Sequence, residues 1–333
     1  CCLPKQKIFS GQENDMRCYF APMEGITGYI FRNCHSRFFP GVDRYYMPFL
    51  SPRQDHNFTR RELDDILPEH NEGVHAVPQL LTKQPEDFLW AAGELAAMGY
   101  REVNLNLGCP SGTVTAKGKG SGLLARREEL ERLLDGIFAA APMAVSVKTR
   151  LGMHDPEEFG PLLELYNRYP IAELTVHPRI RGDFYKKPVR PEYFDLAVRM
   201  SRAPLCYNGD VVTPGDWEKK SARWPEVEAV MIGRGLVADP SLAGRLKGER
   251  PAGLEELRAF HHELYETYAQ AFGSRRNAML RMKEAWTYLI HLFGDSGKLE
   301  RRIRKAADTA DFESAVSEVF RTLPLLDEPA RTG

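Results

Sequence analysis

The chain alternates short apolar segments with longer amphipathic ones over its first three quarters. The short segments are rich in β-branched and aromatic residues, as buried strands are, and the longer ones repeat apolar positions at helical spacing. Strands are predicted at Arg17–Ala21, Arg44–Pro48, Val74–Leu80, Glu102–Leu107, Met143–Lys148, Ala172–His177, Pro204–Asn208 and Glu228–Ile232. Most of these strands end about 25 to 31 residues apart, the length of one strand, one helix and their loops. Eight such units predict a (β/α)8 barrel, with an open doubly wound sheet as the alternative.

The strand signals stop near Pro251, and the rest of the chain has a helical pattern. Helices are predicted at Leu254–Phe272, Asn277–Leu292, Leu299–Ala307 and Asp311–Leu323, with Gly, Asp or Pro between them. The pattern therefore predicts three parts: residues 1–16 as an N-terminal extension without order, 17–250 as an α/β barrel, and 251–333 as a small helical bundle.

The chain is nearly neutral overall, and basic residues are concentrated in one segment. Among 333 residues, 45 Lys and Arg are balanced by 46 Asp and Glu, which excludes a globally basic nucleic-acid binder. Between residues 271 and 305, however, nine basic residues stand against three acidic ones. Such a cluster is either an ordinary solvated helix face or a surface that binds phosphate groups. Its candidates for contact with RNA are Arg301, Arg302 and Arg304.

Six cysteines show neither a C-x-x-C pair nor a metal-ligand spacing with histidine. The chain has no apolar stretch of about 18 residues and no hydrophobic segment typical of a signal peptide near residue 1. We therefore expect no metal, no disulfide framework and no membrane segment, and a cytoplasmic protein that is a monomer.

The candidate chemistry follows the strands, because a barrel of this type carries its active site at the carboxyl ends of its strands. The seventh and eighth strands end in Asn208-Gly209-Asp210 and Gly233-Arg234-Gly235, two short turns whose backbone N–H groups can bind a phosphate. Lys148 ends an apolar strand, where its ammonium group needs an anionic partner, either a ligand or a neighbouring carboxylate. His177 and Arg179 share another strand end and suggest an anion or base contact.

Cys109 stands between a glycine and a proline in the longest loop at this face. A lone cysteine is most often a small buried apolar residue, but a thiol in such a loop can also act as a nucleophile or a proton donor. Neither a P-loop nor a G-x-G-x-x-G fingerprint is present, so a nicotinamide cofactor would bind only transiently.

Five motifs together resemble the flavin-dependent tRNA-dihydrouridine synthases. They are Pro22-Met23-Glu24-Gly25-Ile26-Thr27, Asn104-x-Asn106-x-Gly108-Cys109-Pro110, Lys148-Thr149-Arg150, Asn208-Gly209-Asp210 and Gly233-Arg234-Gly235. The resemblance spans about residues 17–246, and the helical tail is similar in kind to the family's RNA-binding bundle. It implies that NADPH reduces bound FMN and that a uridine of structured RNA, normally tRNA, receives hydride at C6 and a proton at C5.

The resemblance also implies roles for individual residues. Cys109 would be the general acid, and Asn106, Arg150 and Arg179 would hold the uracil ring and nearby phosphates. Contacts with FMN would come from Pro22, Met23, Glu24, Gln79, Lys148, His177, Asn208, Gly209, Asp210, Gly233 and Arg234.

Two positions depart from the family's pattern. Leu107 replaces a cysteine, and Pro178 replaces the glycine of a His-Gly-Arg motif, which removes a backbone donor and stiffens that turn. Three alternatives stay open at this point: the same chemistry on ribosomal RNA, an FMN-dependent dehydrogenase of a free pyrimidine, and an RNA-binding module without redox chemistry.

Overall fold

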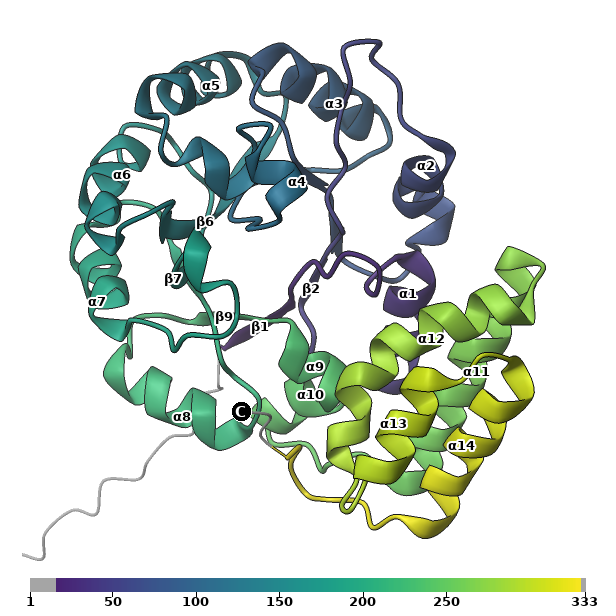
Figure 1. The fold of residues 1–333 in the computed structure, drawn as a ribbon. Coiled ribbons are helices and arrows are strands. Elements are labelled where there is room, and N and C mark those ends of the chain that lie inside the picture. The colour runs from purple at the N-terminus through teal and green to yellow at the C-terminus, as the bar shows by residue number, and fades with distance from the viewer. Residues whose placement is uncertain (1–15, 331–333) are drawn as a thin grey trace, which may run out of the picture.

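The computed structural model describes residues 16–330, in which the short apolar segments form a barrel of parallel strands (Figure 1). Around the barrel the strands follow the order β3-β2-β1-β9-β8-β7-β6-β5-β4. This arrangement confirms the predicted barrel over the open sheet. The predicted N-terminal extension lies, apart from Met16, outside the described residues. The strands are β1 (Arg17–Phe20), β2 (Arg44–Tyr46), β3 (Ala76–Val77), β4 (Gln79–Leu80), β5 (Glu102–Leu107), β6 (Ala144–Gly152), β7 (Leu174–Ile180), β8 (Leu205–Asn208) and β9 (Ala229–Ile232).

The third predicted strand is divided by Pro78 into β3 and β4. β3 pairs with β2, and β4 pairs with β5, so this one segment closes the barrel between two neighbours. Proline has no N–H to donate, which interrupts the ladder, but its carbonyl oxygen still accepts from the Asn104 N–H over 2.9 Å.

Helices surround the strands as an outer ring (Figure 1). Each buries one face against the strands. The helix Arg127–Ala140, for example, buries Leu130, Leu133, Leu134 and Ile137 at helical spacing. The ring comprises α1 (Tyr29–Phe38), α2 (Arg60–Ile66), α3 (Pro85–Ala97), α5 (Arg127–Ala140), α6 (Phe159–Tyr166), α7 (Pro191–Met200) and α8 (Pro214–Arg223). Shorter helices are α4 (Gly112–Thr115), α9 (Arg234–Ala238) and α10 (Leu242–Leu246).

Side-chain alternation along the strands separates two apolar clusters. The larger fills the space between strands and helices, and the smaller lies inside the barrel. The inner cluster consists of Tyr19, Ala21, Tyr46, Val77, Cys206, Ala229 and Met231. Polar side chains fill much of the remaining interior, including Gln79, Asn104 and Ser146, each no more than 1% exposed. The barrel interior is therefore a packed and partly polar core.

The helical bundle packs beside the barrel, next to α1 and α9 (Figure 1). Its helices are α11 (Leu254–Phe272), α12 (Arg275–Leu289), α13 (Gly297–Lys305) and α14 (Thr309–Thr322), which confirms the predicted segments to within three residues at each end. Phe260 of α11 packs on Phe39, with ring centroids 5.1 Å apart, and the apolar core runs without interruption from barrel to bundle. We propose residue 250 as the boundary because the strand–helix alternation ends there.

The described residues also bear on three sequence-based expectations. Cys18, Cys34, Cys109 and Cys206 are free thiols, while Cys1 and Cys2 lie outside those residues. Between residues 16 and 330 no helix is both long and apolar enough to span a bilayer. The same residues include no group of three or more His, Cys, Asp or Glu side chains placed to hold a metal ion.

Candidate active site

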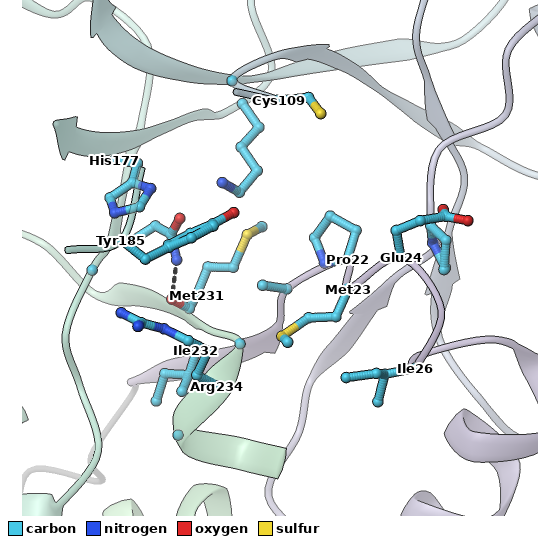
Figure 2. Close-up of a pocket in the computed structure, with 18 of the residues that line it drawn as sticks. Pro22, Met23, Glu24, Ile26, Cys109, His177, Tyr185, Met231, Ile232 and Arg234 are labelled. Atoms are coloured by element: carbon cyan, nitrogen blue, oxygen red, sulfur yellow. Dashed lines mark hydrogen bonds between the residues drawn. The ribbon is translucent and has the colours of Figure 1, made fainter. Parts of the chain in front are cut away.

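A cavity of about 350 Å³ opens at the carboxyl ends of the strands. Figure 2 shows the Tyr185 ring among the residues that line it, between His177 and Met23, with Cys109 on one side and Arg234 on the other. The cavity gathers almost every site residue predicted from sequence, although those residues lie up to about 210 positions apart. The predicted residues that line it are Pro22, Met23, Glu24, Gln79, Asn106, Cys109, Lys148, Arg150, His177, Asn208, Gly209, Asp210, Gly233 and Arg234.

The turns after β8 and β9 form one continuous wall. Asn208 Nδ2 donates to the Met231 carbonyl oxygen over 2.7 Å, which joins the two strand ends. Gly233 lies so close to the turn after β1 that an added Cβ would stand 2.9 Å from Met23 Sδ, so a side chain there would displace Met23. Small residues thus keep backbone N–H groups accessible at this wall, as phosphate binding requires.

Asp210 holds two arginines at the same wall. Arg179 Nη2 donates to Asp210 Oδ2 over 2.6 Å, and Arg234 Nη2 donates to Asp210 Oδ1 over 3.1 Å. Arg234 also lies over the Tyr185 ring, 5.0 Å from its centroid. The ion pair with Asp210 and the contact with the Tyr185 ring hold Arg234 at the pocket rim, and its remaining N–H groups are left to bind an anion.

Arg179 occupies a different place from the one expected. It is 2% exposed and lies behind the cavity wall, outside the set of lining residues. Its guanidinium donates to the Lys187 carbonyl oxygen, to His177 Nε2 and to Asp210. Most N–H donors of the guanidinium are thus used on protein atoms, and direct contact of Arg179 with uracil or phosphate stays a prediction.

The bond from Arg179 also sets the tautomer of His177. A guanidinium can only donate, so Nε2 of His177 accepts and the ring proton resides on Nδ1. Burial, together with the nearby Arg150 and Lys148 charges, holds the pKa of His177 well below its ordinary value. At neutral pH this side chain is therefore an uncharged imidazole with one N–H donor.

Lys148 lies on β6 with its ammonium group in the cavity. Of the residues that the structure describes, none forms a hydrogen bond or an ion pair with that group. Burial, with a smaller contribution from Arg150, lowers the pKa of Lys148 to about 7. The sequence left open whether a carboxylate pairs with this lysine, and the structure supplies none among residues 16–330. A bound anion would restore the charge.

Cys109 is half-buried at the mouth of the cavity, directly after β5. Burial raises the pKa of its thiol above the ordinary value, although Ser111, Arg150 and Lys148 oppose this effect. The side chain is therefore a protonated thiol at neutral pH. Such a group suits a proton donor better than a nucleophile, which needs the thiolate.

The cavity also contains residues that the sequence did not single out. Tyr185 comes from the loop after β7, and Glu284 and Tyr288 come from α12 of the bundle. Tyr185 is 50% exposed and lies against two cations, Arg150 and Arg234. An aromatic residue between charged neighbours in a strand-end loop is a usable sequence signal for Tyr185. Nothing in the local sequence of α12 indicates that it reaches the barrel mouth.

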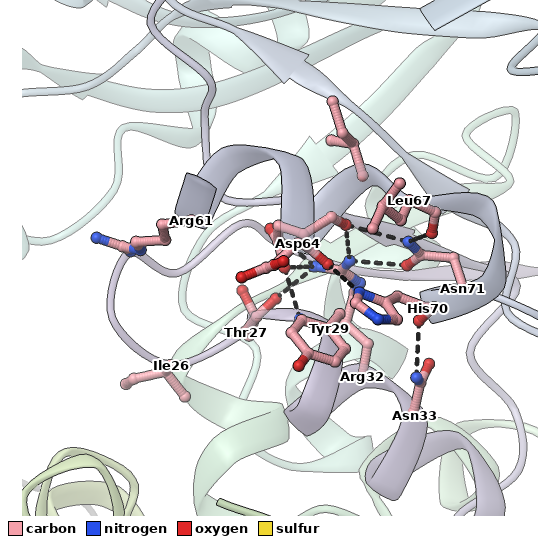
Figure 3. Close-up of polar contacts among 12 residues, drawn as sticks. Ile26, Thr27, Tyr29, Arg32, Asn33, Arg61, Asp64, Leu67, His70 and Asn71 are labelled. Atoms are coloured by element: carbon pink, nitrogen blue, oxygen red, sulfur yellow. Dashed lines mark hydrogen bonds and ion pairs between the residues drawn. The ribbon is translucent and has the colours of Figure 1, made fainter. Parts of the chain in front are cut away.

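A buried polar network around Thr27 and Arg32 (Figure 3) anchors the turn that carries Pro22 and Met23. Thr27 Oγ1 accepts from the Met23 N–H over 2.8 Å, and Arg32 donates to the Thr27 carbonyl oxygen over 2.9 Å. Arg32 is fully buried and pairs with Asp65 of α2, with 3.2 Å between Nη1 and Oδ1. The turn is thus held to α2 through the Arg32–Asp65 ion pair and the bond from Arg32 Nη2 to the Asp65 carbonyl oxygen.

Replacing Asp65 by alanine should destabilise the protein by roughly 3 kcal/mol, because it leaves the buried Arg32 charge without its counter-ion. Asp64 provides the matched control, since it pairs with Arg60, whose side chain is 89% exposed. We expect Asp64→Ala to change stability by less than about 1 kcal/mol. Urea unfolding of both variants measures the difference, and equal stabilities would show that the buried pair carries no special weight.

Part of the basic cluster is neutralised by acids from other helices. Arg302 of α13 donates to Asp311 over 2.8 Å and to Glu318 over 3.0 Å, both on α14. Arg275 likewise pairs with Glu266 and Glu313. Arg302 therefore already has protein partners, whereas Arg301 and Arg304 are exposed, and contact of these three arginines with RNA stays a prediction.

A parallel barrel with a cationic pocket, phosphate-sized turns and a thiol at its carboxyl-terminal face has the arrangement of a cofactor-dependent barrel enzyme. The sequence model described as dihydrouridine synthase matches residues 19–323. The chain therefore belongs to the dihydrouridine synthase family, whose enzymes depend on flavin.

Two curated relatives agree with the family, and one solved structure agrees with the fold. The chain is 31% identical to the tRNA-dihydrouridine(16) synthase of Ralstonia nicotianae, over 94% of this chain and 99% of that protein. It is 29% identical to the enzyme of the same name from Cupriavidus necator, over 89% and 95%. In fold it is similar to an old yellow enzyme homologue from Zymomonas mobilis, with a TM-score of 0.51, 13% identity and coverage of 72% and 91%.

Proposed function

We propose that this protein is an FMN-dependent enzyme that uses NADPH to reduce one uridine of transfer RNA to 5,6-dihydrouridine. The observation that carries the proposal is the unpartnered Lys148 ammonium, which lies in the same cavity as two glycine turns and the protonated Cys109 thiol. The family and the names of its relatives support the substrate. A cytoplasmic monomer remains our prediction for the protein as a whole.

The residues of the cavity fit FMN in charge and shape. Lys148 offers a cation for the electron-rich edge of the ring system, and Met23 and Pro22 offer an apolar surface against which a flat ring can lie. Arg234 and the N–H groups of the turns at Gly209 and Gly233 would hold a single phosphate. Gln79 and His177 supply further N–H donors. A reduced flavin held there supplies a hydride for C6 of uracil.

The protein's own chemical step is the delivery of one proton. As hydride reaches C6, negative charge develops at C5 and O4 of the uracil, and the Cys109 Sγ–H proton neutralises it at C5. Arg150 is held by the Gly108 carbonyl oxygen over 2.9 Å and lies beside the same cavity, where its charge stabilises the developing oxyanion. Water then returns a proton to the thiolate.

A structured RNA must present its uridine turned out of the stack, because the reacting atoms lie inside a cavity. Tyr185, at the rim, offers an exposed ring on which a base can stack. Two full-length relatives are named for position 16, so we propose uridine 16 of transfer RNA as the target. Ribosomal RNA and free pyrimidines are the alternatives to be tested.

Purified protein should be yellow, release FMN rather than FAD on denaturation, and form dihydrouridine in transfer RNA when NADPH is supplied. Nucleoside mass spectrometry with fragment mapping would identify the modified position, and parallel reactions with ribosomal RNA and free uridine would test the alternatives. Colourless protein that takes up no added FMN would overturn the proposal. Activity on free uridine equal to that on tRNA would instead indicate a pyrimidine dehydrogenase.

Among the basic residues of the bundle, we expect the exposed ones to contribute affinity for RNA. Replacing Arg301 and Arg304 together by alanine should weaken tRNA binding. The slope of log affinity against log salt concentration should become shallower by the amount expected for about two lost phosphate contacts. Arg302→Ala should chiefly destabilise the bundle, because it leaves Asp311 and Glu318 unpaired. Binding titrations at several salt concentrations check this, and an unchanged salt slope for the double variant would identify the cluster as a solvated helix face.

A further inference from the structure

A chain of hydrogen bonds descends from the Cys109 turn into the barrel. The backbone N–H groups of Gly108 and Cys109 both donate to Asn106 Oδ1, over 3.0 and 2.9 Å. Asn106 Nδ2 donates to Gln79 Oε1 over 2.7 Å. Gln79 Nε2 in turn donates to Asn104 Oδ1 over 2.7 Å. Two amide side chains that line the cavity are thus oriented by a third, Asn104, which lies beside Gln79 and one step deeper in the barrel than Asn106.

The chain continues to the opposite end of the barrel. Asn104 Nδ2 donates to Ser146 Oγ over 2.9 Å, and the Ser146 hydroxyl donates to Glu102 Oε1 over 2.7 Å. Arg44 supplies the counter-charge, with its Nη1 2.9 Å from Glu102 Oε2. The chain therefore ends on an ion pair, where the carboxylate accepts and has no proton to donate.

The strand geometry accounts for this arrangement. Glu102, Asn104 and Asn106 alternate along β5, so all three side chains point into the barrel. Register places Gln79 of β4 beside Asn104 and Asn104 beside Ser146 of β6, which forms one polar row across three strands. Asn106 lies one step nearer the cavity than this row, and Glu102 one step further from it.

Both ends of the chain impose the same direction on it. The backbone N–H groups at the top can only donate, and the carboxylate at the bottom can only accept. Every amide between them must therefore accept from above through its oxygen and donate downward or sideways through its nitrogen. A flip of Gln79 or Asn106 would set oxygen against oxygen and leave buried N–H groups unsatisfied.

We propose that Asn104, Ser146 and Glu102 are positioning residues, whose hydrogen-bond chain fixes the orientation of the Gln79 and Asn106 amides and holds the Cys109 turn. Each amide nitrogen carries two hydrogens, of which the chain uses one. Because both side chains line the cavity, the second remains available to a ligand with carbonyl acceptors, a class that includes uracil and the flavin ring. The inference rests on the proposed function, because only that function makes such a donor set useful.

Ser146 allows a test with matched variants. Threonine and valine have nearly the same shape, but only threonine retains the hydroxyl that accepts from Asn104 and donates to Glu102. In single-turnover reoxidation of the reduced holoenzyme by tRNA, Ser146→Thr should keep most of the wild-type rate. Ser146→Val should lose about tenfold or more in rate, the effect of one hydrogen bond in a connected chain. Reoxidation by oxygen should be the same in both variants.

NMR of the side-chain amides gives a readout that does not depend on activity. The Gln79 and Asn106 amide signals should shift in Ser146→Val and remain near their wild-type positions in Ser146→Thr. If the valine variant does not fold, Ser146→Ala removes the hydroxyl without adding volume. Equal behaviour of the threonine and hydroxyl-free variants in both measurements would overturn the inference. Failure of the wild-type protein to act on RNA would instead contradict the proposed function, and the amide signals would still test the chain.

Discussion

Replacing Cys109 by alanine should abolish dihydrouridine formation while leaving the earlier half of the reaction intact. The side chain is half-buried at the cavity mouth, and burial raises the pKa of its thiol, so the wild-type group carries a proton at neutral pH. Loss of a general acid costs about 10²–10⁴-fold in rate. We expect Cys109→Ala to fold, to bind FMN and to be reduced by NADPH at close to the wild-type rate.

The decisive measurement is single-turnover reoxidation of the reduced protein. Reoxidation by tRNA should be lost in Cys109→Ala, whereas reoxidation by oxygen should persist. Cys34 offers a matched control, because its thiol is buried beside Phe260, away from the cavity. Cys34→Ala should lower stability without affecting the reaction with RNA. Dihydrouridine formation by Cys109→Ala at the wild-type rate would assign the proton to another donor, and loss of FMN would give Cys109 a structural role.

Replacing Lys148 by methionine should stabilise the ligand-free protein and impair its chemistry at the same time. Burial lowers the pKa of Lys148 to about 7, so the folded state opposes the charge that the unfolded chain accepts readily. Methionine fills similar space without a charge. We expect a gain in unfolding free energy of roughly 1–4 kcal/mol below pH 7, and a loss of about 10²-fold in the rate of flavin reduction by NADPH.

The unfolding free energy of the wild-type protein should rise with pH where Lys148 loses its proton. Below pH 7 the lysine is protonated in both states, so the folded protein carries the full cost of the buried charge. Between about pH 7 and about pH 10 the unfolded chain binds more protons, so wild-type stability rises with pH and approaches that of Lys148→Met. Urea unfolding of the ligand-free proteins at several pH values measures this, with exposed Lys219→Met as a control of unchanged stability. A destabilised Lys148→Met protein at pH 6 would contradict it.

The sequence by itself determined the barrel, the four helices that follow it and most of the cavity. Strand and helix periodicity are local properties, so Glu102–Leu107 could be read as a strand and Leu254–Phe272 as a helix without knowledge of their neighbours. Once a closed parallel barrel was inferred, its geometry placed every strand end at one face. Residues as distant as Met23 and Arg234 were therefore expected in one site, and they line one cavity.

Only the tertiary structure decided which charges are free. Arg179 and Arg302 resemble ligand-binding residues in the sequence, but both form ion pairs within the protein. Arg179 pairs with Asp210, and Arg302 pairs with Asp311 and Glu318. An ion pair depends on which side chains meet across elements, and no local pattern encodes that. Lys148 is the opposite case, because the structure leaves its charge without a protein partner among the described residues.

The register between neighbouring strands could not be predicted from the sequence either. Alternation along β5 could place Asn104 and Asn106 on one side, but not beside Gln79 and Ser146, which lie on neighbouring strands. A shift of register by one residue would turn each of these side chains outward and remove the hydrogen-bond chain. The residues of the site can thus be read from the strand ends in the sequence. The direction of their hydrogen bonds, however, depends on how the closed barrel aligns the strands.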